Sequence, residues 1–183
     1  MVLVTDSGLS ALRDLVAPPV KPFLGGRTWE WLYGELGTRL PADYVALMET
    51  YGGGAWSGWL RLWAPLDPDE FGLAERSALV LDSERAAKER FPEYHPLPLW
   101  PEPGGYLPFG DSIDGDGIGW LTVGSPDEWP LILTPRNHEQ GPPLSGSLAE
   151  TVLEWLSGRL RVKGLYKFDK DELAEAATFW PAD

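Results

Sequence analysis

The residues most suggestive of chemistry lie in an aspartate-rich stretch, Asp111-Ser112-Ile113-Asp114-Gly115-Asp116-Gly117. Carboxylates at this spacing could hold calcium, and setting Asp114 and Asp116 at the third and fifth loop positions places Ser112 first and Val123 twelfth. An EF-hand loop needs an acid at the first position and a bidentate glutamate at the last, and both are missing here. The pattern therefore favours a turn in which aspartate side chains bond nearby backbone amides.

Paired carboxylates could instead serve a hydrolase, one as acid and the other as base or nucleophile. The close pairs are Asp114 with Asp116 and Asp127 with Glu128. In a chain with 28 acidic residues such pairs arise by composition alone, and turns select aspartate. These pairs are therefore weak evidence for catalysis.

Histidine and glycine add no catalytic pattern. His95 and His138 are isolated, and the chain has no cysteine, so no thiolate nucleophile or closed zinc set is expected. No Gly-x-Ser-x-Gly motif accompanies the serines. The run Gly52-Gly53-Gly54 follows a predicted helix, whereas a phosphate-binding loop precedes a helix and carries a lysine. We expect a turn at these glycines, and no catalytic residue, cofactor or metal in the protein.

The distribution of charge is more informative. Residues 91–135 contain no lysine or arginine, whereas acidic and aromatic residues are frequent there. Such a segment could form a docking face for a basic protein, with aromatic rings as anchors and charge that accelerates encounter. A solvated acidic surface over an aromatic core explains the same residues, and composition leaves both interpretations open. The candidate partner-binding residues are Glu102, Asp111, Asp114, Asp116, Trp120, Asp127 and Glu128.

Periodicity, capping residues and turn residues predict the elements that position these side chains. Helices are predicted over 7–16, 29–36, 41–51, 73–90, 147–157 and 169–178. Strands are predicted over 59–63, 106–109, 117–123, 129–133 and 159–163, with 106–109 and 159–163 as edge strands. Helices near both ends and strands between them indicate an α+β fold of one domain.

Composition excludes some classes of function. The 183 residues have a formal net charge of −13, and a mean hydropathy of −0.21 is typical of a soluble globular chain. Phosphate repels such a chain, so direct nucleic-acid binding is not expected. No apolar run approaches the roughly 18 residues of a membrane span, and the N-terminal residues lack the basic region of a targeting signal. We expect no membrane contact and a cytoplasmic location.

The order of several motifs resembles the SUKH superfamily, and more narrowly its branch of bacterial proteins related to the fungal Knr/Smi-type cell-wall regulators. The resemblance covers roughly 29–160 and implies a central, mostly antiparallel sheet flanked by helices. It also implies that Pro41, Tyr44, Gly52, Gly53 and Gly54 are scaffold residues. The motifs are Leu40-Pro41-Ala42-Asp43-Tyr44, Tyr51-Gly52-Gly53-Gly54, a Trp/Leu strand, Leu107-Pro108-Phe109-Gly110, Asp114-Gly115-Asp116 with Trp120, Trp129-Pro130-Leu131-Ile132-Leu133, and Ser145-Gly146-Ser147 before the helix through Trp155-Leu156.

The resemblance implies a binding role without catalysis. Bacterial members are taken to be immunity proteins that bind and neutralise a cognate toxin, often a nuclease, and nuclease toxins tend to be basic because they bind phosphate. The fungal relatives imply an alternative, a regulatory scaffold, and a carboxylate-based hydrolase or calcium-binding domain is the second alternative. We expect a protein partner, a monomer or weak dimer, and three parts: an N-terminal segment (1–26), a SUKH-like domain (27–160) and a C-terminal extension packed on it (161–183).

Overall fold

A computed structural model describes residues 7–183, and residues 1–6 of the expected N-terminal segment lie outside the described residues. The α-helices are α1 (Ser7–Leu15), α2 (Trp29–Leu36), α3 (Ala42–Tyr51), α4 (Leu73–Arg90), α5 (Leu148–Leu156) and α6 (Lys170–Leu173). The strands are β1 (Gly54–Trp56), β2 (Leu60–Leu62), β3 (Tyr106–Ser112), β4 (Gly117–Leu121), β5 (Leu131–Thr134) and β6 (Phe179–Pro181). Two short 3₁₀ helices are η1 (Pro92–Tyr94) and η2 (Pro126–Glu128).

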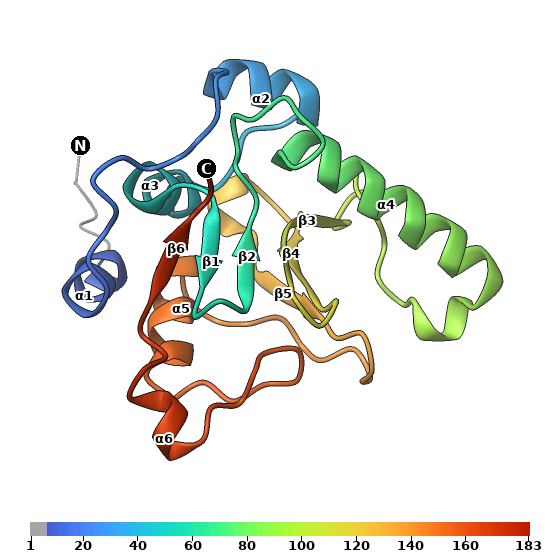
Figure 1. The fold of residues 1–183 in the computed structure, drawn as a ribbon. Coiled ribbons are helices and arrows are strands. Elements are labelled where there is room, and N and C mark those ends of the chain that lie inside the picture. The colour runs from blue at the N-terminus through green and yellow to red at the C-terminus, as the bar shows by residue number, and fades with distance from the viewer. Residues whose placement is uncertain (1–6) are drawn as a thin grey trace.

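The strands form one sheet in the order β5-β4-β3-β2-β1-β6, and each neighbouring pair is antiparallel. Figure 1 shows the strands in the middle of the molecule, with α1, α3 and α5 gathered at one side and α4 projecting from the other. The predicted α+β single-domain fold, with an antiparallel sheet flanked by helices, is confirmed.

Aromatic rings fill the core between α3 and the strands. Tyr44 of α3 is fully buried, and its ring centroid lies 5.3 Å from that of Phe109 in β3 and 4.9 Å from that of Trp120 in β4. Tyr51, at the end of the same helix, lies 4.6 Å from Trp56 of β1. Large aromatic side chains bury roughly 150–250 Å² each, so these contacts contribute much of the stability.

The expected scaffold residues flank α3. Pro41 precedes its first residue, and Gly52 follows its last with φ of +78°, which favours glycine. A Cβ on Gly52 would lie 2.4 Å from the backbone nitrogen of Phe23. A Cβ on Gly53 or Gly54 would likewise meet a neighbouring segment at less than 3.0 Å. The three glycines allow a close approach of backbones that no larger residue permits.

The predicted helices 29–36 and 73–90 have the bounds of α2 and α4. Helix α5 begins with the predicted capping box, in which the Glu150 backbone N–H donates to Ser147 Oγ at 3.2 Å and the Ser147 N–H donates to Glu150 Oε2 at 2.8 Å. None of the helices within residues 7–183 combines the length and apolar character needed to cross a membrane.

The segment 106–109 is not the predicted edge strand. It begins β3, an interior strand that pairs with β2 on one side and β4 on the other. Proline cannot donate to a sheet ladder, so it is tolerated inside a sheet mainly at irregularities. The register between β3 and β4 shifts between Pro108 and Gly110, and this irregularity lets the strand continue to Ser112.

The prediction of an edge strand over 159–163 is also wrong. This segment is irregular because it turns back on α5, where the backbone N–H groups of Arg159 and Leu160 donate to the Glu154 carbonyl at 2.9 and 3.0 Å. The sheet instead ends on that side with β6, which pairs with β1. The last helix is shorter than predicted and ends at Leu173.

Candidate docking surface

The first group of predicted acids lies at the β3–β4 hairpin, where the fold itself binds the carboxylates. Asp111 accepts from Arg61 Nε at 2.7 Å and from Arg76 at 3.0 Å, and its side chain is largely buried. Arg61 is its cross-strand partner on β2, whereas Arg76 reaches it from α4. Two guanidinium groups therefore neutralise this carboxylate before any partner arrives.

The other two hairpin aspartates hold the loop in shape. Asp114 accepts a hydrogen bond from Trp59 Nε1 at 2.7 Å. Asp116 accepts from Ser112 Oγ at 2.9 Å and from the Arg136 backbone N–H at 3.0 Å. Within residues 7–183 no group of three His, Cys, Asp or Glu side chains is placed to hold a metal ion. The loop is a turn, but Ser112 Oγ, and not an aspartate, accepts from the backbone N–H groups of Asp114 and Asp116 at 3.2 and 3.1 Å.

A second group of predicted acids lies at the opposite end of these strands. Asp127 accepts from the Ala42 backbone N–H at 2.8 Å, so it caps α3 from 85 residues away. Glu128 Oε2 accepts from the Ser125 backbone N–H and hydroxyl at 2.9 and 2.7 Å, and these bonds lower the pKa of its carboxyl. Glu102 is exposed in the loop before β3.

The predicted acids therefore do not form one face. Tyr106 pairs with Leu121 at one end of the hairpin and Asp111 pairs with Gly117 at the other, so β3 separates the two groups by roughly 17 Å at 3.3 Å per residue. Trp120 is only 1% exposed and lies in the core, where no partner can touch it. Trp120 is therefore not a docking residue, because its ring packs on that of Phe109 with the centroids 4.1 Å apart.

Several charged side chains lie together in a cleft between α4 and the sheet. It has a volume of about 740 Å³, and its walls come from α4, from η1 with the chain that follows it, and from 135–140. His95, for which the sequence predicts no role, lies in this wall, and its Nδ1 is 2.8 Å from Glu84 Oε2. The carboxylate residues that line the cleft are Glu84, Glu93, Asp111, Asp116 and Glu139, against the cationic residues Lys88 and Arg136.

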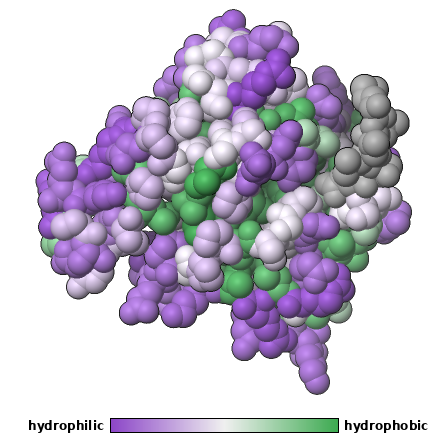
Figure 2. Space-filling model, turned by 180° about the vertical axis from the view of Figure 1, so that it is seen from behind, coloured by the Kyte–Doolittle hydropathy of each residue, from purple (hydrophilic) through white to green (hydrophobic). Residues whose placement is uncertain are grey.

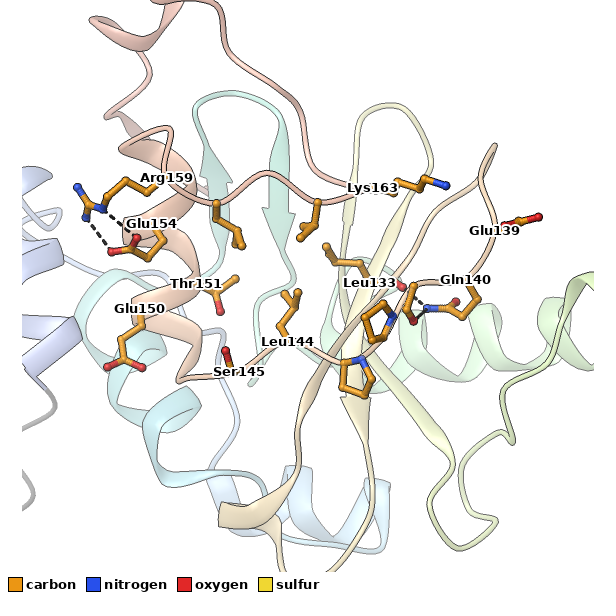
Figure 3. Close-up of a pocket in the computed structure, with 15 residues that line it drawn as sticks. Leu133, Glu139, Gln140, Leu144, Ser145, Glu150, Thr151, Glu154, Arg159 and Lys163 are labelled. Carbon is orange, nitrogen blue, oxygen red and sulfur yellow. Dashed lines mark hydrogen bonds and ion pairs between the residues drawn. The ribbon is translucent and has the colours of Figure 1, made fainter.

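A second hollow, of about 570 Å³, lies between α5 and the loop that follows β5. Figure 3 shows Leu133 and Leu144 in the middle of this groove, with Thr151 of α5 on one side and Gln140 on the other. Leu160 and Val162 of the irregular segment 159–163 complete an apolar lining. Seen from behind, the molecule has apolar side chains gathered at the hollowed centre of the face, with polar side chains around them (Figure 2).

Sequence reasoning missed this groove for a physical reason. The alternation of Leu160 and Val162 with basic residues predicts an edge strand, but the segment is irregular and both apolar side chains line the groove together with Leu133 of β5. The pair Pro142-Pro143 close after β5 was the available signal that the chain there cannot form a further strand.

Comparison with known proteins identifies the family of this chain. A family model described as the SMI1 / KNR4 family (SUKH-1) matches residues 29–158, and all residues that line the cleft fall inside the matched range. No curated protein and no solved structure matches the chain. The family match spans most of the chain and includes the scaffold residues from Pro41 to Gly54. The chain therefore belongs to the SMI1 / KNR4 family (SUKH-1).

Proposed function

We propose that this chain is a cytoplasmic immunity protein that binds a cognate basic toxin, such as a nuclease, and neutralises it without catalysis. Membership of the SMI1 / KNR4 family supports a protein-interaction module. The observation that carries the finer proposal is the net charge of −13 together with the exposed carboxylates of Glu93 and Glu139 in the cleft wall, which pair with no cation within residues 7–183. A negative protein attracts a basic toxin and can raise the encounter rate by about 10- to 1,000-fold.

The contacts of the aspartate-rich hairpin favour binding over a hydrolase or calcium role. Asp111 is neutralised by two arginines, and Asp114 and Asp116 accept hydrogen bonds that shape the loop. These carboxylates are engaged in contacts that hold the hairpin to β2, α4 and the chain after β5.

Titration calorimetry with the catalytic domain of the toxin encoded beside this chain tests the proposal. At low ionic strength of about 50 mM we expect a one-to-one complex, consistent with a monomeric immunity protein. At about 500 mM salt the affinity falls at least roughly tenfold, because screening shortens the reach of charge to a few Å. The toxin's activity should be inhibited at the same stoichiometry.

Absence of heat and of inhibition at low salt contradicts the proposal. Binding to a host protein in place of the toxin supports the regulatory-scaffold alternative instead. Calcium added alone should produce no heat, and a calcium-dependent response of the wild type that Asp114→Asn abolishes would support the metal-binding alternative.

A further inference from the structure

The acidic cleft and the apolar groove share one wall. Glu139 and Gln140 line both hollows, and the successive β5 residues Leu133 and Thr134 line the groove and the cleft respectively. We name the two hollows and the 135–140 segment between them the ridge surface. Because the hollows are adjacent, one contact segment of a partner can reach both.

The charged groups that line the cleft favour binding of a cationic side chain. Both permanent cations in its lining are tied to backbone carbonyls: Lys88 Nζ donates to the Leu97 carbonyl at 2.6 Å, and Arg136 donates to the Asp114 carbonyl at 3.3 Å. By contrast, the exposed carboxylates of Glu93 and Glu139 have no hydrogen bond or ion pair within the described part of the chain. Glu93 and Glu139 therefore offer two unpaired carboxylates that a lysine or arginine of a partner can neutralise.

Trp63 forms a packed part of the cleft wall. It lines the cleft and is only 5% exposed, yet its indole Nε1 has no hydrogen-bond acceptor among residues 7–183. The Arg76 guanidinium lies over its ring at 5.2 Å, so the ring itself is well packed. The Trp56 indole and the Tyr44 hydroxyl of the core are likewise buried without an acceptor among the same residues, so Trp63 contributes a packed wall to the cleft and not a contact atom.

The groove supplies the apolar part of the surface. Leu133, Leu144, Leu160 and Val162 form its apolar lining. The ion pair between Arg159 and Glu154 at 2.8 Å and the cationic Lys163 border it (Figure 3). A hollow of about 570 Å³ accommodates one or two large side chains. Protein interfaces are commonly anchored in this way, by a few side chains in a desolvated pocket with charged groups at the rim.

We infer that the ridge surface is the toxin-binding site, and that it receives a toxin segment carrying lysine or arginine next to a large apolar side chain. The cationic side chain enters the acidic cleft, and the apolar side chain enters the groove on the other side of 135–140. This inference rests on the proposed function and adds to it the place of contact and the chemistry of the contacting segment.

Two matched pairs of variants test the cleft. Glu93→Gln with Glu139→Gln removes two charges at the ridge surface, and Glu35→Gln with Glu70→Gln removes two exposed charges elsewhere. Stopped-flow association with the toxin's catalytic domain should slow about 3- to 10-fold for the first pair, because charges at an interface act mainly on the association rate. The second pair should change the rate less than about twofold.

Val162→Asp tests the groove, with the same substitution at the fully exposed Val20 as its control. We expect Val162→Asp to weaken toxin affinity more than about tenfold, mainly through faster dissociation, and Val20→Asp to leave it unchanged. Val162→Ala should also weaken toxin affinity and should disturb folding less. Thermal melts confirm that each variant is folded.

The outcomes separate this inference from the proposed function. If the wild type binds the toxin but the two charge pairs slow association equally, or Val162→Asp binds like Val20→Asp, the ridge surface is not the site and the immunity role stands. If the wild type does not bind the toxin at all, both the immunity role and this inference are refuted.

Discussion

Truncating Trp120 provides the sharpest test of how the aromatic residues are used. Its side chain is 1% exposed, and its ring centroid lies 4.1 Å from that of Phe109, 4.9 Å from Tyr44 and 6.1 Å from Trp129. The ring is thus enclosed by other rings in the core between α3 and the sheet. Trp120→Ala removes it, and we expect the cost to appear in folding.

The magnitude follows from the buried area. A buried tryptophan removes about 200 Å² from water, which at about 25 cal/mol per Å² corresponds to about 5 kcal/mol. Measured truncations of buried aromatic residues cost about 3–5 kcal/mol. For a domain of this size, that loss lowers the melting temperature by roughly 6–20 °C. Trp120→Phe keeps most of the packing and should cost about 1–2 kcal/mol.

Urea unfolding followed by circular dichroism measures these losses, with Trp180→Ala as the matched control. Trp180 lies on β6 and is 62% exposed, so its truncation should cost no more than about 1 kcal/mol. If Trp120→Ala loses no more stability than Trp180→Ala, the core placement of Trp120 is refuted. A folded Trp120→Phe variant should bind the proposed toxin partner with unchanged affinity, and a specific loss of binding would return Trp120 to the docking residues.

Three further predictions concern the scaffold. Asp43→Ala removes the acceptor that Asp43 Oδ2 offers to the Leu148 N–H at 3.0 Å, so urea unfolding should show a loss of about 1 kcal/mol. Gly52→Ala should lose more than about 2 kcal/mol in the same assay, because φ is +78° and a Cβ would strike a neighbouring backbone, whereas Gly34→Ala within α2, where nothing lies within 4 Å, should gain about 0.5–1 kcal/mol. Burial raises the pKa of Tyr51 to about 12, so the stability from its neutral phenol is present below its unfolded pKa of about 10 and is lost as pH rises from about 10 to about 12. The fall in melting temperature between about pH 9 and about pH 11 should therefore be smaller for Tyr51→Phe than for the wild type. An equal fall in the two proteins would contradict this assignment.

The helices could be predicted from the sequence because their signals are local. Helix α5 depends on the capping box of Ser147 and Glu150, three residues apart, and α2 ends at Gly37 with φ of +74°. Such caps act within one turn, so neighbouring residues in the sequence contain the information. The edge or interior position of a strand depends on pairing with distant segments, which local sequence does not contain, so the interior position of β3 could not be predicted.

The candidate site was harder to predict because its contacts are long-range. Asp111 meets Arg61 and Arg76, 50 and 35 residues away, and Asp127 caps α3 at Ala42. A segment without lysine or arginine therefore appeared uncompensated in sequence, although distant segments supply its partners. The same limit applies to the groove, whose lining comes from β5, the loop after it and 159–163.

Hydrogen–deuterium exchange of the complex with the proposed toxin partner tests the central claim most directly. The account predicts that binding slows exchange in 93–97, 135–145 and 159–163, which form the walls of the cleft and groove. Amides near Glu102 and Asp127, at the far end of the β3–β4 hairpin, should exchange at the same rate in the free and bound protein. Slower exchange confined to that far end would contradict the account and locate the docking surface there.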